Sequence, residues 1–269
     1  MKVEDCLSVC ISLDRRPDRW AEFKATADAA GFPVSRMSAV DAKAFTMPVH
    51  EHPDISLLTA HNLLRSVRRS HYEIDAPGAV GASLSHFKAW RLLADSSKPA
   101  LFVFEDDAEL PVDFKERVTA VMAELPADWD LVQFQNTKFN HGLAGCSPDP
   151  ALDTWQLCTS LMGAYAYMIS PSGARKLLAL AYPIELHVDA YMAFMCRMGH
   201  IKMIWHPLID IPNPDKDSDI AHGAQGILNV PTDMEKHGVV ALDMMEVIGI
   251  MSMAAVAGGL LALAYAGRK

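Results

Sequence analysis

The sequence has few cysteines and no C-x-x-C pair. The five that it has are widely scattered: Cys6, Cys10, Cys146, Cys158 and Cys196. An odd number at irregular spacing argues against both a disulfide framework and a zinc site built from cysteine pairs. We therefore expect reduced thiols, most of them buried.

The chain also lacks an excess of positive charge. Its 24 Lys and Arg residues face 33 Asp and Glu, which gives a formal net charge of -9. This balance argues against a general nucleic-acid binder, whose affinity rests on neutralising phosphates. The 269 residues suffice for one large domain, and neither repeats nor a linker precede about His237. We expect residues 1–236 to form a single domain.

A secretory apolar segment is missing at the N-terminus, where residues 1–5 lead directly into a strand-like run, so no signal peptide is expected. The other end differs, because Val247–Ala266 carries no charged residue over about the length that a bilayer core requires. We expect residues 237–269 to form an apolar helix. It would associate with the cytoplasmic face of a membrane, as a tail anchor or peripherally. A buried alanine-rich helix is the alternative.

Apolar runs alternate with segments of helical period from the beginning of the chain. Residues 6–13 predict a buried strand, and a helix that includes Trp20 ends at Gly31. Residues 32–40 predict a second strand. The alternation indicates an α/β fold that begins with a βαβ unit.

Three consecutive carboxylates, Glu105, Asp106 and Asp107, follow a short apolar run at residues 101–104. The run predicts a buried strand, which delivers the residues after it to the carboxyl edge of a sheet, where α/β ligand sites lie. Acidic side chains in that place repel one another and raise their pKa values unless a cation or hydrogen-bond donors compensate. We interpret the triplet as a divalent-metal site.

Two further features bear on this edge of the sheet. Arg15, Arg16 and Arg19 follow the first predicted strand and lie beside a helix N-terminus, a setting that suits a phosphate or nucleotide as well as it suits a solvated turn. His86 lies on an apolar face of the helix that starts near Pro77. A lone histidine in such a position is usually a core residue with satisfied hydrogen bonds.

Five segments stand in series between residues 7 and 222: 11–19, 78–86, 104–107, 163–174 and 188–189. In order and spacing they resemble glycosyltransferase family 25, the family of bacterial lipooligosaccharide galactosyltransferases and of procollagen galactosyltransferases. The resemblance implies a GT-A-like, nucleotide-sugar-binding α/β domain with a mixed, mainly parallel sheet. It also implies transfer from a UDP-sugar, usually UDP-galactose, with inversion and usually with Mn²⁺ or another divalent cation.

The same resemblance implies roles for individual residues. Glu105 and Asp107 would hold the metal ion and the donor pyrophosphate, and Asp106 would hold the ribose or the sugar. The nucleotide pocket would be lined by Ser12, Leu13, Arg15 and Arg19. His222 would be a third metal ligand, by analogy with other GT-A enzymes.

Inversion in one step needs a base that takes a proton from the acceptor hydroxyl. Asp189 stands at the family's V-D position and is the candidate, although it could instead orient the donor sugar or cap its helix. Ala190 follows where an aromatic residue is common in the family, which leaves the acceptor open.

The leading hypothesis is an inverting, metal-dependent glycosyltransferase of lipopolysaccharide biosynthesis that transfers a hexose, galactose in the first instance, to a glycan or lipid-linked acceptor. An alternative is a catalytically inactive, membrane-anchored relative that binds glycans or proteins. The intact triplet opposes it, because an inactive protein has no reason to keep that repulsion. A phosphatase-like enzyme is disfavoured because the triplet follows a middle strand.

Overall fold

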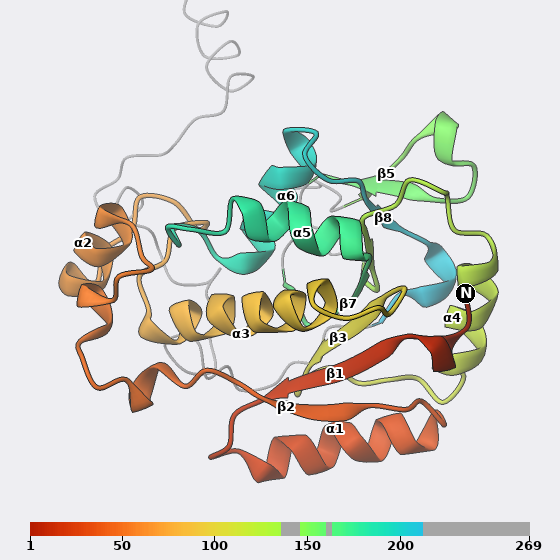
Figure 1. Cartoon of the computed structure of the whole chain (residues 1–269), viewed down its shortest axis with the longest axis horizontal. Coiled ribbons are helices and arrows are strands. Elements are labelled where there is room, and N and C mark those ends of the chain that lie inside the picture. The colour runs from red at the N-terminus through yellow and green to blue at the C-terminus, as the bar shows by residue number, and fades with distance from the viewer. Residues whose placement is uncertain (136–145, 160–162, 212–269) are drawn as a thin grey trace, which may run out of the picture. The chain divides into compact units, whose positions relative to one another are not determined.

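The computed structural model describes residues 1–135, 146–159 and 163–211 (Figure 1). His222 and the expected apolar helix at 237–269, with Val247–Ala266, lie outside these residues. Within the described ranges, no helix combines the length and the apolar character needed to cross a bilayer.

The described residues form an eight-stranded sheet in the order β2-β1-β3-β7-β4-β8-β6-β5. The strands are β1 (Leu7–Ser12), β2 (Ser35–Ser38), β3 (Leu101–Glu105), β4 (Leu131–Gln133), β5 (Cys146–Pro148), β6 (Gln156–Cys158), β7 (Ala166–Ile169) and β8 (Met203–Trp205). The βαβ unit predicted at the N-terminus is confirmed, because β1 and β2 are parallel and are joined by a helix.

The sheet is mixed, as expected, but the expectation that it is mainly parallel is wrong. The described pairs β1·β2, β1·β3 and β4·β8 are parallel, whereas β3·β7, β4·β7, β5·β6 and β6·β8 are antiparallel. Parallel neighbours need a long crossover, usually a helix. The described residues between β5 and β6 contain only the short 3-10 helix Pro150–Leu152, which is too short for a parallel crossover, so these two strands pair in the antiparallel direction.

Helices cover both faces of the sheet and make three layers (Figure 1). One face packs against α3 (Pro77–Ala94), α5 (Pro171–Ala179) and α6 (Val188–Arg197); the other packs against α1 (Pro17–Ala29) and α4 (Phe114–Ala123). The remaining helices are α2 (Leu57–Arg65) and the 3-10 helices Val3–Asp5, Ala42–Ala44, Val49–Glu51 and Pro207–Ile209.

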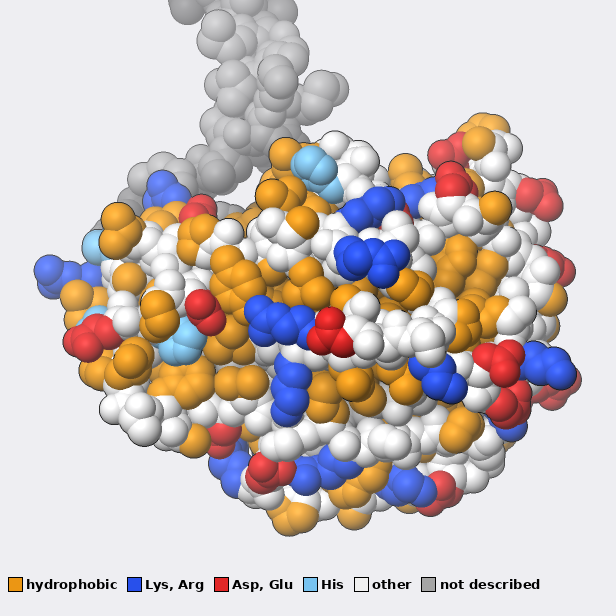
Figure 2. Space-filling view, in the orientation of Figure 1, with side chains coloured by type: hydrophobic (Ala, Val, Ile, Leu, Met, Phe, Trp, Pro, Cys, Tyr) orange, Lys and Arg blue, Asp and Glu red, His pale blue; other side chains and the backbone are white. Residues whose placement is uncertain are grey.

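The two layers of core follow from the period-two pattern of the strands. In β3, Leu101 and Val103 belong to the core under α3, while Phe102 and Phe104 belong to the core over α1 and α4. A strand that is apolar at every position therefore lies at the centre of the sheet with both faces buried. On the outer face that carries α3 and α5, acidic and basic side chains are interspersed among apolar ones (Figure 2).

A close contact fixes α3 beside the chain that follows β2. A Cβ atom at Gly81 would lie 2.5 Å from the carbonyl oxygen of Val40, so a larger residue cannot fit without a shift of the backbone. Ser85 supports the same contact, because its Oγ accepts from the N–H of Val40 at 2.8 Å and donates to the carbonyl oxygen of Gly81 at 2.7 Å. The packing places the N-terminal half of α3 along the ends of β1 and β2.

Two cysteines correct the expectation of reduced thiols. Cys146 and Cys158 are directly opposite each other in the β5·β6 hairpin and form a disulfide bond. Cys6, Cys10 and Cys196 are free, and the last two are buried, as expected. Cysteine count and spacing did not reveal the pair, because an antiparallel hairpin brings together residues that are distant in sequence.

Candidate functional site

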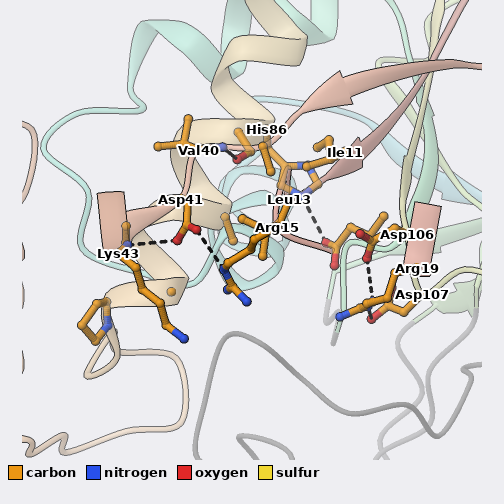
Figure 3. Close-up of a pocket in the computed structure, with 17 residues that line it drawn as sticks. Ile11, Leu13, Arg15, Arg19, Val40, Asp41, Lys43, His86, Asp106 and Asp107 are labelled. Carbon is orange, nitrogen blue, oxygen red and sulfur yellow. Dashed lines mark hydrogen bonds and ion pairs between the residues drawn. The ribbon is translucent and has the colours of Figure 1, made fainter. Parts of the chain in front are cut away.

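A cavity of about 270 Å³ opens at the carboxyl ends of β1, β2 and β3 (Figure 3). It is lined by residues of four segments, 11–19, 39–43, 77–86 and 105–107. These three strands run in parallel, so the loops that follow them meet at one edge of the sheet. The cavity therefore lies where the acidic triplet was expected to form a site.

Arg19 of α1 lies beside two carboxylates of the triplet on one side of the cavity (Figure 3). Its Nε lies 2.9 Å from Asp106 Oδ1 and its Nη2 lies 3.2 Å from Asp107 Oδ2. The side chains of Arg19 and Asp106 are only 10 % and 9 % exposed. The guanidinium group of Arg19 thus neutralises part of the negative charge of the triplet.

The two aspartates have perturbed ionisation. Burial raises the pKa of Asp106, and the charge of Arg19 opposes this effect. Burial and then the neighbouring charge of Glu105 raise the pKa of Asp107 to about 7, again against the effect of Arg19. Asp107 therefore exchanges its proton near neutral pH, where a cation competes with the proton for the same oxygen atoms.

The carboxylates meet one requirement of a divalent-cation site. Asp107 Oδ1 is buried and lacks a hydrogen-bond partner among the described residues, and carboxylate oxygens are the ligands that Mg²⁺ and Mn²⁺ prefer. The described part of the chain has no cluster of three or more His, Cys, Asp or Glu side chains placed to share an ion. The donor set fits an ion held by one or two carboxylates together with substrate phosphates.

The third carboxylate, Glu105, is held by His86. The histidine Nε2 lies 3.1 Å from Glu105 Oε1, and its Nδ1 lies 2.8 Å from the hydroxyl of Tyr167. His86 is thus a buried core residue with both nitrogens paired, as predicted, but the prediction missed that one partner belongs to the site. The small or polar residues Ala82 and Ser85, which line the cavity together with His86, could have indicated that this part of α3 faces a site.

The other side of the cavity is formed by the chain that follows β2 (Figure 3). Arg15 Nε donates to Asp41 Oδ2 at 2.9 Å, and Asp41 Oδ1 accepts from the N–H of Lys43 at 3.0 Å. Of the residues predicted to line a nucleotide pocket, Leu13, Arg15 and Arg19 do line the cavity. Ser12 is buried at the end of β1 and is not among the lining residues. Val40, Asp41 and Lys43 were not predicted.

Asp189 lies outside the cavity lining, in the first turn of α6. Its Oδ2 accepts from the N–H of Gly163 at 2.5 Å and its Oδ1 from the N–H of Ala190 at 2.8 Å. Gly163 leads to Tyr165, whose carbonyl oxygen accepts from the N–H of Glu105 at 2.8 Å. Asp189 therefore holds a loop that adjoins the triplet. Its role as a base stays a prediction, as does the role of His222 outside the described residues.

A buried polar cluster beside Asp189 was also missed. Arg68 Nε lies 3.6 Å from Asp75 Oδ2, and both side chains are buried. Burial lowers the pKa of the neighbouring His187, and the charge of Asp189 opposes this shift. These residues come from two segments, 68–75 and 187–189, that are more than 100 residues apart, so no local pattern in the sequence indicates their proximity.

The fold and the cavity define an α/β protein whose ligand site lies at the carboxyl edge of its parallel strands, with acidic and arginine side chains in the lining. A family profile described as "Glycosyltransferase family 25 (LPS biosynthesis protein)" matches residues 8–192. The matched region covers more than half of the chain and contains β1 from its second residue, the triplet and Asp189. The chain belongs to glycosyltransferase family 25, which confirms the resemblance.

Relatives in this family carry different names. "Probable inactive glycosyltransferase 25 family member 3" of Rattus norvegicus is 27% identical over 69% of this chain and 32% of its own length. "Procollagen galactosyltransferase 2" of Mus musculus is 25% identical over 82% of this chain and 34% of its own length. "Procollagen galactosyltransferase 1-A" of Xenopus laevis is 26% identical over 58% of this chain and 25% of its own length. The chain spans about a third or less of these relatives.

Proposed function

We propose that the protein is an inverting, metal-dependent hexosyltransferase of the GT-A type. It transfers galactose from a UDP-sugar to a glycan or lipooligosaccharide-type acceptor. The observation that carries the proposal is the cavity at the carboxyl ends of β1, β2 and β3, where the triplet and Arg19 meet. Membership of the family supports it, since relatives include proteins named galactosyltransferases.

Glu105 and Asp107 are the proposed protein ligands of Mn²⁺ or another divalent cation, and His222 is retained as a further ligand. The buried and unpartnered Asp107 Oδ1 supports this assignment. When bound, the ion would neutralise the negative charge that develops on the departing diphosphate, and this needs no proton transfer.

The remaining lining suits a nucleoside diphosphate. Arg19 and Arg15 bring guanidinium groups to the two sides of the cavity, and such groups bind phosphate oxygens through paired hydrogen bonds. Leu13 and Val40 supply apolar surface for the base, and Asp106 supplies a carboxylate for the ribose or the sugar. Both arginines are already paired with carboxylates, so diphosphate binding exchanges one anionic partner for another.

Asp189 is the proposed base for the acceptor hydroxyl. Its two hydrogen bonds to backbone N–H groups fix the direction of the carboxylate at the start of α6. It adjoins the triplet through Gly163 and Tyr165, whose carbonyl oxygen accepts from the N–H of Glu105. Orientation of the donor sugar is the alternative role for the same position.

The first experiment measures UDP release from UDP-galactose and UDP-glucose, with and without Mn²⁺, against a panel of glycan and lipid-linked acceptors. We expect release that depends on Mn²⁺. Asp107→Asn should abolish this activity, whereas Glu109→Gln, two residues further along and outside the lining, should retain it. Failure of the wild type to turn over any donor would refute the proposal, and full activity of Asp107→Asn would refute the role of that carboxylate.

A second candidate is a catalytically inactive protein that binds glycans or partner proteins, and the name "Probable inactive glycosyltransferase 25 family member 3" among the relatives favours it. Calorimetry with UDP and Mn²⁺ separates the two candidates when it is combined with the release assay. An enzyme binds the pair and turns over a donor, whereas an inactive relative without a donor site binds neither.

Membrane association through Val247–Ala266, on the cytoplasmic face, remains part of the proposal. Its support is the absence of charge over a length suited to a bilayer. We expect the full chain to stay with membranes after a carbonate wash and a chain that ends at Lys236 to be released. Release of both would show that the segment is not an anchor.

A further inference from the structure

Four side chains form a hydrogen-bonded series that ends at the cavity. Trp90 Nε1 donates to the hydroxyl oxygen of Tyr167 at 2.8 Å, the same hydroxyl lies 2.8 Å from His86 Nδ1, and His86 Nε2 lies 3.1 Å from Glu105 Oε1. Trp90, Tyr167 and His86 are each at most 1 % exposed. Glu105, with a side chain that is 22 % exposed, lines the cavity, and His86 lines it as well.

The chemistry of the groups fixes the direction of the series. An indole N–H only donates, so Tyr167 accepts from Trp90 and its own hydroxyl proton is left for His86 Nδ1. Burial raises the pKa of Tyr167 well above its ordinary value, which keeps that proton in place. A neutral imidazole that accepts at Nδ1 carries its proton on Nε2, where it donates to Glu105. Every side-chain polar atom of Trp90, Tyr167 and His86 then has a partner in the series.

We propose that His86 is a positioning residue for Glu105. It fixes one oxygen of the carboxylate from inside the protein, and Tyr167 with Trp90 fixes the histidine ring in turn. The inference rests on the proposed function in one respect, because the ligand that Glu105 meets is taken to be Mn²⁺ with UDP.

His86 preorganises the Glu105 carboxylate for ligand binding. A glutamate side chain has three rotatable bonds, and holding it in place costs conformational entropy when a ligand binds. A buried donor that fixes the carboxylate beforehand removes part of this cost. Outer partners of metal-binding groups typically change metal affinity or activity by about 10- to 100-fold when they are removed.

Two substitutions at one position separate positioning from packing. In His86→Gln the amide nitrogen takes the place of Nε2 and can still donate to Glu105. In His86→Asn the shorter amide takes the place of Nδ1 and contacts Tyr167 but not Glu105. Both replace the ring by an amide, and the donor to Glu105 remains only in His86→Gln. The shorter Asn loses one further buried methylene, and the melt of each variant measures that packing difference separately from Mn²⁺ affinity.

The test is calorimetry of the full chain with Mn²⁺ in the presence of UDP, together with UDP alone and a thermal melt of each variant. We expect His86→Asn to lower Mn²⁺ affinity by about 10- to 100-fold, with His86→Gln much closer to the wild type and UDP binding without metal unchanged. Tyr167→Phe is a second test that keeps the ring of His86: it removes the hydroxyl that holds His86 Nδ1 and that accepts from Trp90, and it should lower Mn²⁺ affinity in the same direction.

The outcomes distinguish this inference from the proposed function. If the wild type binds Mn²⁺ with UDP and His86→Asn binds it equally well, the positioning role is overturned and the proposed function stands. An equal loss in His86→Asn and His86→Gln also overturns it, because packing alone would explain that result. Wild type that binds neither ligand overturns the proposed function and this inference together.

Discussion

Replacing Asp107 by Asn tests the charge balance of the cavity in metal-free protein. The side chain is 27 % exposed, and burial and then Glu105 raise its pKa from 3.8 to about 7, although Arg19 acts in the opposite direction. The charged form of Asp107 is therefore less stable in the folded protein than in the unfolded chain. Asparagine has nearly the same shape and carries no charge at any pH.

The sign of the effect follows from proton binding. Between pH 3.8 and about 7 the folded protein binds the Asp107 proton more tightly than the unfolded chain does. The free energy of unfolding therefore falls as pH rises through this window and levels off above it. At 1.36 kcal/mol per pKa unit, and with a reduction for partial exposure, the wild type loses about 2 kcal/mol relative to Asp107→Asn between pH 5 and pH 8.

The measurement is thermal unfolding in EDTA at several pH values between 5 and 8. We expect the variant to gain about 4 to 8 °C in melting temperature relative to the wild type over that range. Asp128→Asn is the control without a pH trend: a hydrogen bond from Lys202 lowers the pKa of Asp128 below its ordinary value of 3.8, so this group is ionised in the folded and the unfolded chain throughout the range and its variant should differ from the wild type by a constant amount. A constant difference between wild type and Asp107→Asn at all pH values would refute the charge argument. Mn²⁺ with UDP should stabilise only the wild type.

Three further changes have defined outcomes. Arg19→Gln leaves Asp107 and its neighbour without their guanidinium partner, so urea unfolding at pH 8 should show a loss of about 3 kcal/mol, opposite in sign to Asp107→Asn. Gly81→Ala places a Cβ 2.5 Å from the Val40 carbonyl oxygen; we expect a loss of about 1 to 3 kcal/mol in a melt and weaker UDP binding, because Val40 lines the cavity. Replacing Cys146 and Cys158 by Ser should cost about 3 kcal/mol more in non-reducing urea than under reduction.

Features that depend on neighbouring residues were predicted from the sequence. β3 follows from an uninterrupted apolar run, and α1 follows from helical spacing that stops at Gly31, where φ is +59°. In each case the signal and the structure that it specifies lie within a few residues of each other.

Features that depend on strand pairing were missed. The direction of β7 between β3 and β4 decides that Tyr165 lies beside Glu105, and no periodicity in β7 encodes that direction. Pairing of β5 with β6 likewise determines the disulfide bond. His86 could be assigned to the core from its helical face, but its hydrogen bond to Glu105 depends on how α3 lies across β3.

Electrostatic repulsion within the triplet predicts a compensating positive charge but does not identify the group that carries it. Mutual repulsion of three carboxylates called for a compensating cation, and Arg19 together with the donor of His86 supplies part of that compensation. Repulsion by itself is therefore no proof of a metal ion. The cluster still sets three carboxylates against one guanidinium, so with a neutral His86 it retains two negative charges when fully ionised. Asp107 is the carboxylate whose charge is compensated least. Its pKa is raised to about 7, and its Oδ1 lacks a hydrogen-bond partner among the described residues. A divalent cation carries the charge that would balance it.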